Sequence, residues 1–130
     1  MPNLRIEHIA FNVSDPVAMA DWYVENLGMR IARQGDAPQH VRFLADTAGK
    51  TVVEIYNNPG APIPDYAGMN PFTLHVAFHA DDPDAAKAAL VAAGATFVDQ
   101  SELPDGSRLM FLRDPWGLTV QLVRRAKPLL

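Results

Sequence analysis

Residues 72–83 read Phe-Thr-Leu-His-Val-Ala-Phe-His-Ala-Asp-Asp-Pro, and this stretch decides the fold. Residues 5–16, Arg-Ile-Glu-His-Ile-Ala-Phe-Asn-Val-Ser-Asp-Pro, carry the same pattern 67 positions earlier. The displacement pairs identical residues: His8 with His75, Ala10 with Ala77, Phe11 with Phe78, Asp15 with Asp82 and Pro16 with Pro83. The same displacement places Val53-Glu54-Ile55 on Val120-Gln121-Leu122. Such self-similarity is typical of a duplicated supersecondary unit.

The first copy has the signals of a β-α-β-β-β module. Apolar and polar residues alternate over 4–13, which predicts a strand. Asp15 is suited to cap a helix, and Pro16 is suited to its first position, where its missing N–H costs nothing. We expect this helix to end at Gly28, in the left-handed conformation. Three further strands are expected at about 29–34, 40–45 and 51–57.

The second copy repeats this order. It predicts a strand over 72–79, a helix from Pro83 to Ala93, and strands near 95–100, 108–113 and 118–124. Between the copies, residues 58–71 contain four prolines and two glycines, which indicates a connector because proline cannot donate to a strand ladder. Each copy alone would be of marginal size. We therefore expect one domain over 1–130, with module 1–57, connector 58–71 and module 72–130.

Composition excludes several classes of function. The formal charge of −4 and the lack of clustered Lys and Arg, apart from Arg124, Arg125 and Lys127 near the C-terminus, argue against nucleic acid as a partner. The chain has no cysteine, so disulfides, thiolate zinc sites, iron–sulfur clusters and cysteine nucleophiles are excluded. No run approaches the ~18 apolar residues of a membrane helix, and residues 1–8 are too polar for a signal-peptide core. The expected location is the cytoplasm.

Four polar residues are the best candidates for chemistry: His8, Glu54, His75 and Gln121. Each lies inside an apolar alternation in the middle of a predicted strand, where an unpaired carboxylate would be costly. Two imidazoles, a carboxylate and an amide oxygen would together suit a divalent metal ion. The alternative is a duplicated hydrogen-bonded cluster without catalytic function. His8 and Glu54 both recur at the same displacement, as His75 and Gln121, and this recurrence favours the metal site over the alternative.

With these motifs, the chain resembles the vicinal oxygen chelate superfamily, which includes glyoxalase I, methylmalonyl-CoA epimerase, extradiol dioxygenases, and fosfomycin- and bleomycin-resistance proteins. The resemblance rests on the paired modules, the His on each first strand, the Glu or Gln on each last strand, and the Asp-Pro-Trp-Gly turn at 114–117. It implies an α+β fold in which two βαβββ modules form a cup-shaped mixed sheet. It also implies a divalent metal (Zn, Ni, Co, Mn or Fe) bound by His8, Glu54, His75 and Gln121, a small-molecule substrate and a homodimer.

The sequence departs from the commonest pattern at Gln121, where metalloenzyme members usually have Glu. An amide cannot accept a proton at neutral pH, so Glu54 is the expected catalytic base. The leading hypothesis is a metal-dependent lyase or isomerase of the glyoxalase type, which stabilises an enediolate-like intermediate of a small oxygenated substrate. The alternative is a metal-free, bleomycin-resistance-like protein that sequesters a ligand. An extradiol-type dioxygenase ranks third, because those relatives have a carboxylate on the last strand.

Overall fold

The computed structural model describes residues 1–130, and the chain divides into two units, Met1–Pro64 and Asp65–Leu130. Each unit contains a four-stranded mixed sheet and one α-helix in the order β-α-β-β-β, as the sequence predicts. The α+β class is therefore confirmed. That both units complete one cup-shaped domain stays a prediction. Neither helix is long and apolar enough to cross a membrane.

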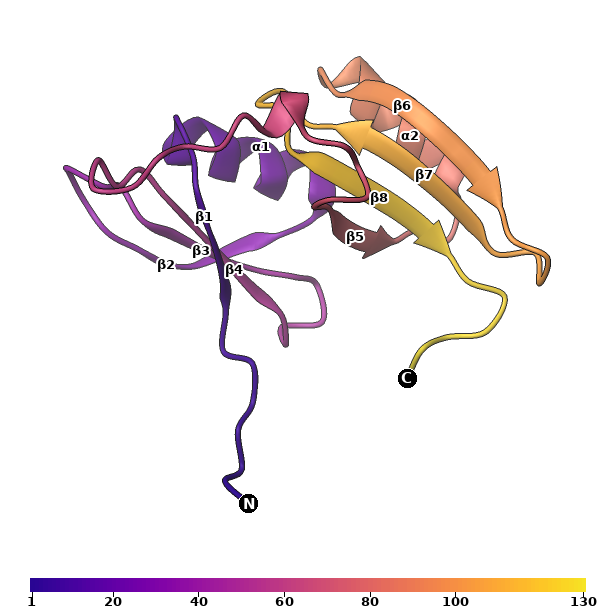
Figure 1. The fold of residues 1–130 in the computed structure, drawn as a ribbon, viewed down its shortest axis with the longest axis horizontal. Coiled ribbons are helices and arrows are strands. Elements are labelled where there is room, and N and C mark those ends of the chain that lie inside the picture. The colour runs from indigo at the N-terminus through magenta and orange to yellow at the C-terminus, as the bar shows by residue number, and fades with distance from the viewer. The chain divides into compact units, whose positions relative to one another are not determined.

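In the N-terminal unit, the sheet order is β1-β4-β3-β2, with β1 parallel to β4 and the other pairs antiparallel. Helix α1 packs against this sheet (Figure 1). The packing buries Tyr23 of the helix and Leu44 and Ile55 of the sheet almost completely. The elements are β1 (Ile9–Asn12), α1 (Pro16–Leu27), β2 (Arg30–Gln34), β3 (Arg42–Ala45) and β4 (Val52–Tyr56).

The C-terminal unit repeats the arrangement with the sheet order β5-β8-β7-β6 and a parallel pair, β5 and β8. Helix α2 packs on one face of the sheet (Figure 1), and Leu90, Met110 and Leu112 are buried in this unit. The elements are the 3₁₀ helix η1 (Tyr66–Gly68), β5 (Val76–His79), α2 (Pro83–Ala92), β6 (Thr96–Glu102), β7 (Arg108–Arg113) and β8 (Thr119–Arg124).

Both helices begin as the sequence predicts. The Asp15 carboxylate accepts a hydrogen bond from the Ala18 amide at 3.0 Å, and Asp82 accepts one from the Ala85 amide at 3.1 Å. Gly28 ends α1 in the left-handed conformation, with φ of 67°. These caps satisfy amide groups that the first helical turn leaves unpaired, so each Asp-Pro motif fixes where a helix starts.

The pairing register confirms the duplication. Ile9 is the partner of Val53 across β1 and β4, and Val76 is the partner of Val120 across β5 and β8. Both residues of the second pair lie 67 positions after those of the first. Repeated register places Glu54 and Gln121 at equivalent points of equivalent strands.

The first strand of each module is shorter than predicted. Residues 4–8 lie outside β1 and are exposed. In the β1–β4 register residues 4–7 would align with residues 48–51, which precede β4 and include the turn where the Asp46 carboxylate accepts a hydrogen bond from the Lys50 amide. The partner strand has not yet begun there. Likewise, residues 71–74 form a turn, in which the Phe72 amide donates to Asn70 Oδ1.

A half-buried arginine, Arg113, joins the end of the connector to the C-terminal sheet. The Arg113 guanidinium donates to the carbonyl oxygens of Tyr66, Gly117 and Met69 at 2.9, 3.2 and 2.6 Å, and to Thr119 Oγ1 at 3.2 Å. Gly117 closes the predicted turn through its amide hydrogen bond to Asp114 O, with φ of 92°. A Cβ on Gly117 would lie 2.7 Å from Ala67 Cβ, so only glycine permits this close approach.

Candidate functional site

In the N-terminal unit, His8, Phe43 and Glu54 form a group on one face of the sheet. His8 precedes β1, and its Nε2 lies 3.1 Å from the Oε2 of Glu54 in the middle of β4. Phe43 of β3 is the cross-strand partner of Glu54, and its ring meets the His8 ring edge-on, with 5.9 Å between the centroids. The Glu54 side chain is only 15% exposed. The structure therefore joins two of the predicted site residues.

His8 has a carboxylate at each of its ring nitrogens, Glu7 at Nδ1 and Glu54 at Nε2, and these carboxylates affect its pKa. The Nδ1 atom is hydrogen-bonded to Glu7, and this bond is the main reason that the pKa of His8 is raised. Partial burial opposes the rise, and the charges of Glu7 and Glu54 add to it. Because Nδ1 donates to Glu7, the Nε2 lone pair of a neutral His8 would face the Glu54 oxygen directly. Only a proton or another cation between these two atoms makes that arrangement favourable.

In the C-terminal unit, His75, Phe111 and Gln121 form the matching group. Phe111 of β7 is the cross-strand partner of Gln121, and its ring meets the His75 ring edge-on at 5.2 Å between the centroids. His75 Nδ1 lies 2.8 Å from the Pro71 carbonyl oxygen. A carbonyl can only accept, so Nδ1 carries a proton; in the neutral ring Nε2 then keeps its lone pair, which is the tautomer a metal ligand needs.

The donor set fits a divalent ion in chemistry and, for one pair, in spacing. A metal ion with ligands at about 2.0–2.2 Å brings two of them to roughly 3.0–3.5 Å from each other, and His8 Nε2 and Glu54 Oε2 have such a separation. Gln121 supplies a neutral oxygen and is 7% exposed. No three His, Asp or Glu side chains of the chain are grouped as metal ligands. The full set of His8, Glu54, His75 and Gln121 stays a prediction.

Phe43 and Phe111 are the site residues that sequence reasoning missed. Each lies opposite the strand residue of its group and against the histidine ring. They are displaced by 68 positions instead of 67, so the repeat pairs neither with the other. The available signal was a phenylalanine in the third strand of each module.

Comparison with known proteins places the chain in a family. A model of the Glyoxalase/Bleomycin resistance protein/Dioxygenase superfamily matches residues 5–122. The chain belongs to this superfamily. The match covers both modules and all four predicted ligands, so the resemblance seen in the sequence is confirmed at the level of family and fold.

Three proteins with which the chain can be compared are each distantly similar to it. A protein of Vibrio cholerae named "Probable lactoylglutathione lyase" is 27% identical over 95% of this chain and 93% of its own length. The crystal structure of a glyoxalase family protein from Bacillus cereus has a TM-score of 0.80 at 17% identity, with 95% of each chain covered. The crystal structure of TnmS3, an antibiotic binding protein from Streptomyces sp. CB03234, has a TM-score of 0.68 at 21% identity and covers 94% of this chain and 96% of that chain. At such identities the two structures establish the fold alone.

Proposed function

We propose that this protein is a metal-dependent lyase or isomerase of the glyoxalase type that acts on a small oxygenated substrate. The proposal rests chiefly on the His8–Glu54 pair, in which an imidazole nitrogen and a carboxylate oxygen face each other at 3.1 Å. The lactoylglutathione lyase named among its relatives makes this class of chemistry the natural first candidate.

The ligand set would be His8, Glu54, His75 and Gln121, whose side chains together carry a single negative charge. A divalent ion held by them would keep a net positive charge, and it would polarise the oxygens of a bound substrate. Pro71 holds His75 in the tautomer whose Nε2 can coordinate. Phe43 and Phe111 would fix the orientation of the two imidazole rings and limit the access of water to them.

Glu54 is the proposed base, because it is the only ionisable oxygen in the set. It would accept a proton from a carbon next to a carbonyl group of the substrate, and Gln121 would contribute polarity without taking a proton. Its low exposure and its contact with His8 fix where the carboxylate points.

Metal content tests the first part of the proposal. The protein, purified mildly and supplied in turn with Zn, Ni, Co, Mn or Fe, should hold one of these ions near 1:1 by elemental analysis. His8→Ala and His75→Ala should both lose the ion. His40→Ala is the matched control, because His40 lies outside both groups. Wild-type protein that takes up none of the ions would overturn the proposal.

Proton transfer tests the second part. The metal-loaded protein should exchange solvent deuterium into dihydroxyacetone, or form S-lactoylglutathione from methylglyoxal and glutathione. Glu54→Gln should lose this activity while retaining most of the metal. Full activity in that variant would refute Glu54 as the base. It would not contradict the proposed metal site.

A ligand-sequestering protein is the second candidate, because TnmS3, an antibiotic binding protein, has a similar fold. The charge of −4 is compatible with a cationic ligand but common among proteins. A metal-free wild type that binds bleomycin by titration calorimetry would favour this second function.

A further inference from the structure

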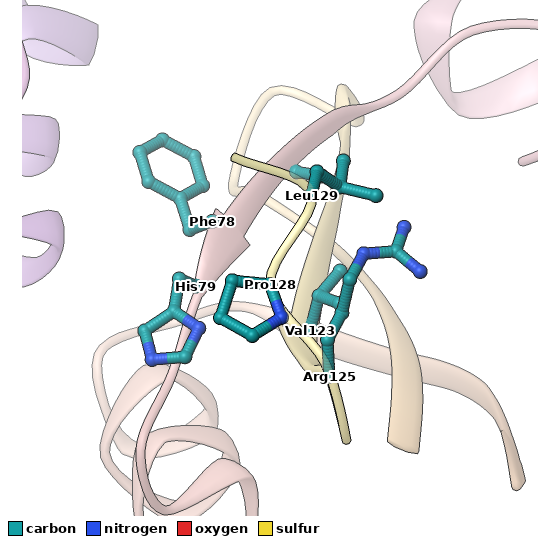
Figure 2. Close-up of a pocket in the computed structure, with 7 residues that line it drawn as sticks. Phe78, His79, Val123, Arg125, Pro128 and Leu129 are labelled. Carbon is teal, nitrogen blue, oxygen red and sulfur yellow. The ribbon is translucent and has the colours of Figure 1, made fainter. Parts of the chain in front are cut away.

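The C-terminal unit contains a pocket that none of the four proposed metal ligands lines. The pocket has a volume of about 350 Å³, within the range of small-molecule sites. Its lining is mostly apolar, with two ionisable side chains, and consists of Ala77, Phe78, His79, Val123, Arg125, Pro128 and Leu129. Figure 2 shows Pro128 and Leu129 between Phe78 and His79 on one side and Arg125 on the other. The segment after β8 thus forms a wall of the pocket.

The pocket continues the face of the sheet that carries Gln121. Ala77 is the partner of Gln121 across β5 and β8, and His79 is the partner of Val123 one step further along. Side chains two apart in a strand share a face, so Gln121 and Val123 of β8 lie on the same side. Arg125 follows directly after β8 and lines the pocket together with Val123. A molecule in the pocket therefore lies next to the Gln121 group, toward the C-terminal end of β8.

The duplicated module shows why a pocket forms here. The positions equivalent to His79 and Arg125 are Asn12 and Asn58. Asn12 donates to the carbonyl oxygens of Asn58, Ala61 and Pro62 at 3.0, 3.0 and 3.3 Å, and its own oxygen accepts from the Asn58 amide at 2.8 Å. These bonds fasten the segment after β4 to β1.

In the second module this fastening is missing. His79 replaces the asparagine, and its Nε2 is hydrogen-bonded to Asp81 at 2.9 Å instead of to the segment 125–129. The segment is held instead by the Ala126 amide, which donates to Ser107 Oγ at 2.9 Å, and the space between the segment and β5 is the pocket.

We propose that this pocket binds a small organic carboxylate, with its apolar body between β5 and Pro128–Leu129 and its carboxylate on Arg125. Arg125 makes no hydrogen bond or ion pair within the chain, so its guanidinium keeps its donors for a ligand. A planar guanidinium matches a carboxylate with two parallel hydrogen bonds. Asp105 is a competing charge, but its pKa is lowered first by the Ser107 amide and only in part by Arg125.

Such a ligand would present its far end to Gln121. The pocket would then select the substrate of the proposed reaction, as an oxygenated compound with an apolar stem and an acid group. Only this assignment as a substrate rests on the proposed function. Binding to the pocket requires no metal.

Hexanoate is a suitable probe, with hexanamide as its uncharged counterpart. Full-length protein with a chelator present should bind hexanoate at millimolar concentration and hexanamide at least about tenfold more weakly. In NMR titrations, the amide signals of Ala77, Val123 and Leu129 should shift. Failure of the wild type to bind hexanoate, or equal binding of hexanamide, would overturn the proposal.

Two neighbouring arginines provide a matched pair of variants. Arg125→Gln should weaken hexanoate binding by at least about tenfold. Arg124→Gln removes the same charge from the opposite face of β8, where Arg124 is the cross-strand partner of Arg108, and should leave binding unchanged. Equal losses in both variants would show that the net charge attracts the probe and would overturn the pocket.

The repeat supplies a second variant, His79→Asn, which restores the residue of the first module. Its amide should fasten the segment 125–129 to β5, close the pocket and weaken hexanoate binding. Unchanged binding would overturn the comparison with Asn12. Since metal uptake is measured separately, a failed metal site and a failed pocket give different results.

Discussion

The ring of Phe111 meets the ring of His75 edge-on, with 5.2 Å between their centroids, and Phe43 has the same relation to His8 at 5.9 Å. An edge-on contact fixes the plane of an imidazole and therefore the direction of its lone pair. The two phenylalanines belong to the predicted metal site as positioning residues, although neither can bind an ion.

Replacing either phenylalanine should loosen the histidine that it contacts. We expect Phe43→Leu and Phe111→Leu each to weaken metal affinity by about tenfold, at the lower end of the effect of groups that orient metal ligands. Affinity can be measured by competition with a chelating dye. Phe97→Leu is the control, since Phe97 contacts Lys87 and no histidine. A loss as large in the control would assign the effect to general destabilisation.

The side chain of Asn12 should contribute to stability. Asn12→Ala removes donors to three carbonyl oxygens and an acceptor for the Asn58 amide in a place that is 9% exposed. Buried polar groups without partners are costly, so the free energy of unfolding should fall by about 2 kcal/mol. Urea denaturation measures the change. His79→Ala, at the equivalent exposed position, should have little effect, and similar losses in both would contradict this account.

Gly117→Ala should destabilise the C-terminal unit. The new Cβ would lie 2.7 Å from Ala67 Cβ and 2.8 Å from Ala67 N, so the chain would have to move apart. We expect a cost of at least about 2 kcal/mol, from overpacking and a strained backbone. Gly106→Ala is the control, with φ of 89° and no atom within 4 Å of the added Cβ. Comparing the melting temperatures of the two variants separates the effect of the contact with Ala67 from that of backbone strain. An equal fall in both variants would rule out the contact as the cause.

The ion pair between Asp84 and Arg108 should make stability depend on pH. Arg108 donates to both Asp84 oxygens, at 2.8 and 3.0 Å, and this is the main reason that the pKa of Asp84 is lowered. A lowered pKa in the folded protein gives stability that is present above the unfolded value, about 3.9, and is lost as the pH falls through the folded value. Asp84→Asn should therefore unfold at lower urea than wild type at neutral pH.

The difference between this variant and wild type should shrink as the pH falls below the unfolded value, because protonation of Asp84 removes the ion pair from wild type. Asp21→Asn on α1 serves as a control, because no basic side chain lies within ion-pair distance of Asp21. Its unfolding midpoint should match that of wild type at both neutral and acidic pH. A difference between Asp84→Asn and wild type that persists in acid would contradict the electrostatic origin.

Much of the fold could be predicted from the sequence, because the repeat marks equivalent points in both modules. The Asp-Pro motifs located the helices, and the positions of Glu54 and Gln121 located the central strands. The lengths of β1 and β5 could not be predicted, since alternation continues beyond the residues where a partner strand exists. Phe43 and Phe111 were not predicted as site residues, because they lie 68 positions apart and the repeat of 67 positions does not pair them. The pocket could not be predicted either, because no local sequence pattern reveals that His79 makes no hydrogen bond to the segment 125–129.

The anchoring of the connector by Arg113 has a practical consequence for work with fragments of this gene. Because Tyr66 and Met69 are hydrogen-bonded to the Arg113 guanidinium on β7, a division of the polypeptide downstream of them would separate Arg113 from these two of its three carbonyl partners. A cut between Pro64 and Asp65 keeps those bonds inside one piece. Complementation by two separately expressed halves should therefore succeed at that junction and fail for a break only six or so residues later.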